Sequence, residues 1–245
     1  MTADIVKTEP AGLLAVPDFM KGDAGRGLEH LKKDDLQIPR LSLAQGLSPQ
    51  LVESDAKYVD GLRLGDMYNS ITGQVYGKGP LTFAVVRADP PRAIEFYPLE
   101  SGGGIKDRDV PLTDPRVSFG KDGEKPVATK FYDYVAVLLP SREWIGLSFK
   151  SSSLKTARIL NTLMKLRSGM PMFGGLYVIS SVAQKKAIGA SVVTYYNFDV
   201  KNAGNITDEA EYNFVKGLYE SISDRVVVVD KGDLDPDAPG AETEM

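Results

Sequence analysis

The residues best suited to bind a charged ligand form a basic stretch between Ser141 and Phe198. This stretch holds eight bases but only one acid, Glu143. The bases are Arg142, Lys150, Lys155, Arg158, Lys165, Arg167, Lys185 and Lys186. Lysine and arginine neutralise phosphate groups, so this charge balance is typical of a surface that binds a polyanion.

Aromatic rings are interleaved with these bases. Those in or beside the stretch are Tyr132, Tyr134, Trp144, Phe149, Tyr177, Tyr195, Tyr196 and Phe198, and Lys130 lies two positions before the first of them. Positive charge combined with rings on which bases can stack is typical of a groove for single-stranded nucleic acid. Core packing is the alternative for each ring taken alone. Strand alternation pairs Tyr196 with Phe198 on one face and Tyr195 with Asn197 on the other, and the sequence leaves open which pair is core.

The end of the chain has the opposite charge. Residues 230–245 contain one base, Lys231, and six acids: Asp230, Asp233, Asp235, Asp237, Glu242 and Glu244. Two prolines and two glycines oppose regular structure, and the segment has too little apolar surface to offset the entropy of ordering, so we expect a disordered tail. One interpretation is a solvated terminus. The other is a tail that competes for the basic groove and binds a partner protein.

The elements that position the basic stretch are predicted to be mainly β-strands. Apolar runs rich in β-branched and aromatic residues predict strands at 81–87, 92–98, 131–140, 144–150, 173–184 and 191–201. Helical spacing after a serine N-cap predicts a helix that begins near Ser151, and residues 207–222 predict a second helix. Residues 65–77 are interpreted as a turn-rich link.

This order of elements predicts a mainly β protein with α: an OB-fold-like Greek-key barrel with an inserted helix and a C-terminal helix. A β-sandwich with added helices is the alternative. We expect a flexible N-terminal arm (1–36), a nucleic-acid-binding domain (37–229) with a loop insertion (99–128), and the acidic tail (230–245).

The sequence argues against most catalytic chemistry. The chain has no cysteine, and its single histidine, His30, lies in the expected arm. Asp107 and Asp109 could chelate Mg²⁺ as in a nuclease, but they lie in the loop insertion rather than on a rigid element. Ser152 and Lys155 have the Ser-x-x-Lys spacing of acyl-enzymes, which helix capping explains more simply. We therefore expect a protein that is not an enzyme, with no catalytic residue, metal or cofactor.

No window of the chain resembles a transmembrane helix, and the first residues lack the pattern of a signal peptide. We therefore expect no membrane partner and a cytoplasmic location.

Four features together resemble phage-encoded single-stranded DNA-binding proteins of the OB-fold type. They are IPRLSLAQGLSP, GDMYNSITGQVYG, LSFKSSSLKTARILNTLMK and the acidic C-terminal tail. The resemblance implies sequence-independent single-stranded DNA binding in phage replication and recombination, in the host cytoplasm. It also implies recruitment of polymerase or helicase through the tail, and allows a homodimer. Such tails often end in an aromatic residue, whereas this chain ends in Met245. The alternative is a phage structural or host-interaction module that binds a protein through the same bases.

Overall fold

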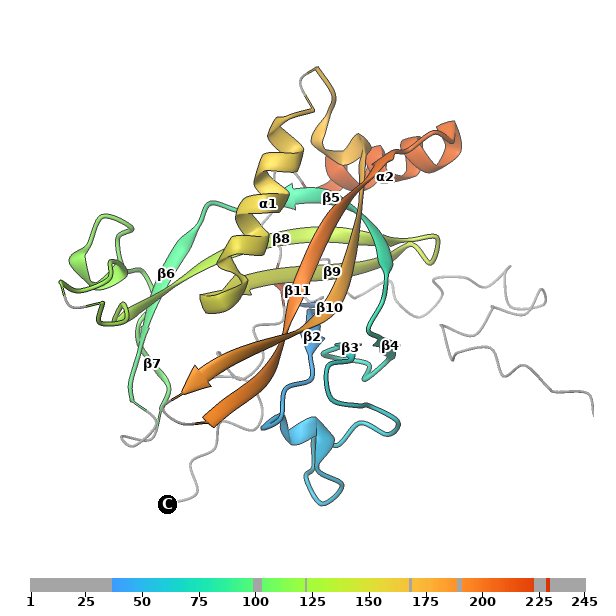
Figure 1. Cartoon of the computed structure of the whole chain (residues 1–245). Helices are drawn as coiled ribbons and strands as arrows, with labels where there is room; N and C mark the ends of the chain where they lie inside the picture. Colours follow the sequence, from blue (N-terminus) through green and yellow to red (C-terminus); the bar gives the residue numbers. More distant parts are fainter. Residues whose placement is uncertain are drawn as a thin grey trace, which may run out of the picture. The chain divides into compact units, whose positions relative to one another are not determined.

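The computed structural model describes residues 37–98, 103–121, 123–167, 169–188, 191–222 and 228–229. The predicted N-terminal arm and the six acids of the predicted tail lie outside the described residues. Within the described part, antiparallel sheets dominate and two α-helices pack on them (Figure 1). The prediction of a mainly β protein with α is confirmed.

The central element is a seven-stranded antiparallel sheet. Its path is β11-β10-β5-β8-β6-β7, and β9 pairs with β8. The strands are β5 (Leu81–Ala88), β6 (Arg92–Phe96), β7 (Ile105–Asp107), β8 (Ala128–Leu139), β9 (Glu143–Lys150), β10 (Gly175–Ile188) and β11 (Ser191–Asn205). One edge of the long strand β8 pairs with β9, and its other edge is shared by β5 and β6. The two strands predicted at 81–87 and 92–98 therefore follow one another along β8.

The strands follow the order expected of an OB-fold-like Greek-key barrel, but the barrel is not closed. Closure would require β9 to pair with β11, and the described residues contain no such pair. Other groups occupy the free edge of β11. The amide of Gln45 donates to Tyr196 O (2.8 Å) and accepts from Tyr196 N (3.1 Å). The Thr156 hydroxyl donates to Phe198 O at 2.7 Å. Because these groups pair with the backbone that β9 would need, the sheet stays open there.

The segment before the sheet also covers the free edge of β9. Gly146 N donates to Pro39 O at 2.7 Å, and Arg40 forms a parallel bridge with Gly146. The chain from Gln37 to Gln45 therefore bonds first to β9 and then to β11.

Two smaller sheets complete the strands. β1 (Gln37–Ile38) pairs in parallel with β12 (Val228–Val229). β2 (Leu41–Leu43), β3 (Met67–Asn69) and β4 (Val75–Gly77) form an antiparallel sheet. The interpretation of 65–77 as a link is thus wrong, because its turn residues connect two short paired strands. Single 3-10 turns lie at Pro49–Leu51, Pro115–Val117, Ser151–Ser153 and Met172–Gly174.

The two α-helices cover opposite faces of the central sheet. On α1 (Leu154–Lys165), Ala157 and Leu160 are buried in a core with Tyr134 of β8. On α2 (Glu209–Ile222), Val215 is buried in a second core with Val135 of β8. Because alternate side chains of β8 enter the two cores, its apolar run is nearly continuous. No helix in the described ranges is long and apolar enough to cross a membrane.

The helix starts differ in how they are capped. Glu211 N donates to Asp208 Oδ2 at 2.7 Å, so Asp208 caps α2 as predicted. At α1 the predicted serine cap is not formed by its side chain. Instead, Ser153 Oγ accepts from Lys150 N and donates to Lys150 O, both at 2.7 Å. The serine thus stabilises the tight turn from β9 into α1.

Candidate functional site

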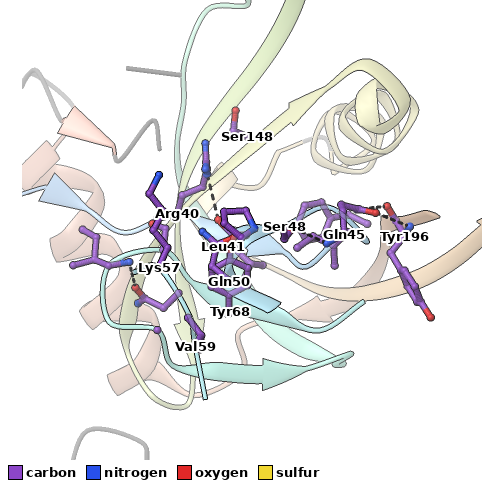
Figure 2. A pocket seen from close by; sticks show the side chains of 18 of the residues that line it. Arg40, Leu41, Gln45, Ser48, Gln50, Lys57, Val59, Tyr68, Ser148 and Tyr196 are labelled. Carbon is purple, nitrogen blue, oxygen red and sulfur yellow. Dashed lines mark hydrogen bonds between the residues drawn. The ribbon is translucent and has the colours of Figure 1, made fainter. Parts of the chain in front are cut away.

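A pocket of about 1030 Å³ lies between the three-stranded sheet, the end of β9, the first turn before α1, and β11 (Figure 2). Its lining residues come from within 37–50, 56–59, 68–73, 148–153 and 196–198. These segments are distant in sequence, and they meet because residues 37–45 bond to both β9 and β11.

The charged residues of this pocket are all positive. Arg40, Lys57 and Lys150 line it, and the described lining includes no Asp or Glu. The whole chain has more acids (33) than Lys and Arg residues (29), so this lining departs from the balance of the protein. We call Arg40, Lys57 and Lys150 the pocket cations. Because the described lining has three cations and no carboxylate, it favours an anionic ligand.

Neutral donors surround the pocket cations. Ser48, Gln50 and Ser148 line the same pocket as Arg40 and Lys57 (Figure 2), and the Ser148 hydroxyl donates to Asp133 Oδ1 at 2.6 Å. Arg40 Nε donates to Ser42 Oγ at 3.4 Å. The turn Ser151–Ser153 also lines the pocket, and α1 begins at the next residue. Hydroxyl and amide groups at a helix N-terminus donate to phosphate oxygens, so these neighbours suit the same kind of ligand as the cations.

The three-stranded sheet is fixed to β9 by a partly buried polar contact. Asn69 Nδ2 donates to Glu143 Oε1 at 2.7 Å, and the Tyr76 hydroxyl donates to the same oxygen at 2.5 Å. Burial raises the pKa of Tyr76 above its usual range, and the adjacent Glu143 adds to this. The phenol is therefore a protonated donor at neutral pH. This contact holds one side of the pocket in place.

The ring of Tyr196 is fixed on the other side. It lies against Gly65, where an added Cβ would come within 2.3 Å of Tyr196 Cε1. Lys78 Nζ lies 4.8 Å from the ring centroid. Gly65 has φ +85°, which favours glycine, so both the space and the backbone conformation at this position depend on the absence of a side chain.

Two predicted site residues line the pocket, Lys150 and Tyr196. Tyr134 requires a correction. It is 2% exposed beneath α1, where its hydroxyl donates to Asn161 Oδ1 at 2.8 Å, and burial raises its pKa. Its ring packs edge-on against Phe149, with 5.8 Å between centroids. Tyr134 therefore presents no open face for base stacking.

Arg142 and Trp144 lie on the α2 side of the sheet. Arg142 pairs with Glu211 at 3.4 Å, and its guanidinium lies 4.5 Å from the Phe214 ring centroid. Trp144 packs against the core beneath α2. Both predicted residues are thus separated by the sheet from the α1 bases, because α2 supplies their packing partners.

Arg167 also serves the fold. It donates to Asn202, to Asn205 Oδ1 (2.8 Å) and to Leu176 O (3.2 Å). Its guanidinium lies 4.8 Å from the Tyr177 ring centroid. These contacts fix the end of α1 to the start of the β10–β11 hairpin.

The remaining predicted residues lie elsewhere on the surface. Lys155, Arg158 and Lys165 are exposed on α1, and Lys185 and Lys186 are exposed near the end of β10. Lys130 Nζ lies 5.0 Å from the Tyr132 ring centroid, and the Tyr195 hydroxyl donates to Gln184 Oε1 at 2.8 Å. The structure therefore distributes the predicted basic strip over several surfaces.

Sequence reasoning missed Arg40, Lys57 and the glutamines of the pocket. The segment QIPRLSLAQGLSPQLV, residues 37–52, contains one base and no acid. That signal was present, but the segment lies outside the most basic stretch. Within the described residues, no group of three or more His, Cys, Asp or Glu side chains is placed to hold a metal ion.

Comparison with known proteins gives one match. A family model described as "Pam3 phage gp34-like protein" matches residues 7–227, which include every segment of the pocket. Searches of curated proteins and of solved structures found no match.

Proposed function

We propose that this chain, which belongs to the Pam3 phage gp34-like protein family and is thus a phage protein, binds single-stranded DNA without acting as an enzyme. The observation that carries this proposal is the pocket lining, with three cations and no acid among its described residues. Single-stranded DNA has one negative charge per nucleotide, and a cationic groove binds its backbone independently of sequence.

The pocket has room for a segment of a polymer. Its volume of about 1030 Å³ lies at the upper end of the range of about 300–1,000 Å³ that is usual for small-molecule sites. Hydroxyl and amide donors lie among the cations, and such groups contact phosphate and sugar without selecting a base. A segment of a flexible strand fits this combination better than one compact ligand.

The strand order also supports the proposal. The path β11-β10-β5-β8-β9 places α1 between two hairpins, β8–β9 and β10–β11. This is the Greek-key path of an OB-type barrel opened between β9 and β11, and proteins with OB folds bind oligonucleotides. The pocket lies beside this opening. We infer an OB-type origin and a role in phage replication or recombination.

The acidic tail has a place in the same proposal. Its net charge of −5 complements that of the pocket. We propose that it competes with DNA for the cations and recruits replication proteins such as a polymerase or helicase.

The test is fluorescence anisotropy of a labelled dT oligonucleotide with the full chain at several salt concentrations. The pocket variant is Arg40→Gln/Lys57→Gln/Lys150→Gln. The matched control, Lys121→Gln/Lys125→Gln/Lys216→Gln, removes the same charge at exposed lysines that do not line the pocket. For single strands, each phosphate contact contributes about 0.7 to the slope of log K against log salt concentration. The pocket variant removes three cations, so the magnitude of this slope should fall by about 2.

The control variant should keep the slope of the wild type. Absence of binding at low salt would refute the proposal and favour a protein partner. Equal binding by the wild type and the pocket variant would place the DNA elsewhere.

A further inference from the structure

Three apolar side chains that line the pocket are exposed. Leu47 is 98% exposed, Ile71 52% and Tyr58 37%. A single exposed apolar residue is ordinary. Three that line one pocket place exposed apolar surface at a candidate binding site. We call these three side chains the apolar wall.

Local hydrogen bonds fix the turns that carry the wall. Ser48 N donates to Gln45 O at 3.0 Å, and Gln45 N donates to Ser48 Oγ at 2.9 Å, which closes the turn around Leu47. Ile71 N donates to Asn69 Oδ1 at 2.9 Å. Tyr58 N donates to Asp55 O at 3.0 Å. The wall is therefore exposed on turns that are internally bonded.

The apolar wall and the pocket cations are interleaved along the chain. Lys57 and Tyr58 are consecutive. Arg40 N donates to Ser70 Oγ at 2.8 Å, and Ser70 directly precedes Ile71. The lining of one pocket therefore holds cationic and apolar residues whose backbones are neighbours. A single strand has the complementary pattern, because anionic phosphates alternate with flat bases whose faces are apolar.

We propose that the apolar wall binds the faces of unpaired bases while the pocket cations bind the phosphates of the same strand. This inference rests on the proposed function and deepens it. A peptide with acidic side chains alone would satisfy the cations but not the wall, and duplex DNA would keep its base faces stacked inside. The structure thus assigns preference for unpaired bases to Leu47, Tyr58 and Ile71, none of which lies in the basic stretch.

The test compares labelled dT with an abasic oligonucleotide of the same length, and so with the same number of phosphates, at one salt concentration. The wall variant is Leu47→Ser/Tyr58→Ser/Ile71→Ser. The control variant, Tyr97→Ser/Leu112→Ser/Val127→Ser, changes matched side chains that are 48%, 41% and 60% exposed and do not line the pocket.

We expect the wild type and the control variant to bind dT about 5- to 150-fold more tightly than the abasic strand, the range for stacking one base. The wall variant should lose this preference and keep the salt slope. The single change Leu47→Ser should reduce the preference without affecting folding, because that side chain is almost wholly exposed.

Three outcomes are separable. Equal binding of dT and the abasic strand by the wild type would overturn the base-binding wall and leave the proposed function standing. A preference retained by the wall variant would also overturn it. If the wild type bound neither strand, the proposed function itself would fail.

Discussion

Two regions of the molecule use cations in opposite ways. At the β6–β7 end of the sheet, Arg116 contacts Glu95 at 2.5 Å, Asp114 at 2.9 Å and Asp107 at 3.1 Å, and Lys106 contacts Glu95 at 2.6 Å. Here the cations neutralise a carboxylate whose side chain is only 5% exposed. The pocket has cations of the same kind but no carboxylate in its described lining.

This difference shows that the number and type of basic side chains in a region do not by themselves define a binding site. A buried carboxylate requires partners, so the cations around Glu95 contribute to the fold. The described lining of the pocket has three cations and no carboxylate, so it favours an anionic ligand. Variants that disturb the pocket should therefore affect binding, and variants at the β6–β7 end should affect the fold alone.

The largest effect should come from Gly65→Ala, which disturbs the pocket from beneath Tyr196. The new Cβ would lie 2.3 Å from Tyr196 Cε1, at a φ of +85°. We expect a loss of about 2–4 kcal/mol in the free energy of unfolding, from backbone strain and overpacking together. Chemical denaturation measures it.

Gly61→Ala is the matched control, because Gly61 has φ +74° and no heavy atom within 4 Å of an added Cβ. Its free energy of unfolding should fall by about 1–2 kcal/mol, from backbone strain alone. Equal losses in the two variants would show that the Tyr196 contact does not matter.

A smaller loss in the free energy of unfolding is expected for Asn69→Ala. This change removes the donor to Glu143 and the acceptor for Ile71 N. Asn69 is 1% exposed. We expect about 2 kcal/mol, because a buried hydrogen bond to a charged group is lost. Denaturation and dT binding should both change, since the turn that carries Ile71 loses its support.

Thr72→Ala is the control for this variant. Its hydroxyl accepts a longer bond of 3.3 Å from Gln74 N in the same turn, but it is exposed. It should change stability little. Unchanged dT binding in the Asn69→Ala variant would separate that turn from the site.

Much of the fold could be predicted from sequence, because it depends on local patterns. The hairpin of β8 and β9 follows from two apolar runs around a turn, and α1 follows from helical spacing. The opening between β9 and β11 could not be predicted, because it depends on contacts between residues far apart in the sequence. Nothing in the sequence near Gln45 indicates that its amide bonds to Tyr196, 151 positions away.

The site was harder to predict for the same reason. The most basic stretch contains Arg142 and Arg167, which long-range contacts assign to the fold. The pocket draws Arg40 and Lys57 from a segment with little net charge. Charge density along the chain located Lys150, but only the three-dimensional arrangement shows that Lys150 lines one pocket together with Arg40 and Lys57.

A smaller effect on binding is expected from Lys155→Gln/Arg158→Gln/Lys165→Gln. These bases are exposed on α1, a helix without acids that begins beside the pocket. They do not line the pocket, so salt screens their attraction for DNA over about 10 Å at 0.1 M. We expect the affinity for dT to fall by less than about tenfold at low salt. At moderate salt the affinity should hardly change. A loss as large as that of the pocket variant would move the site onto α1.

The smallest effect should come from Glu95→Gln, measured as unfolding free energy against pH beside the wild type. Hydrogen bonds from Lys106, and then from Arg116, lower the pKa of Glu95. Its carboxylate therefore stabilises the fold fully above its unfolded-state pKa, about 4.3. This stabilisation is lost as the pH falls through the lower folded-state pKa. Because both cations are partly exposed, solvent weakens the contribution.

Since glutamine does not ionise, the difference in unfolding free energy between the two proteins should shrink only on acidification below that value. Binding of dT at neutral pH should be unchanged, because these cations are already neutralised within the fold. Weaker binding by Glu95→Gln would show that charge at the β6–β7 end reaches the ligand, and would remove the distinction between the two regions.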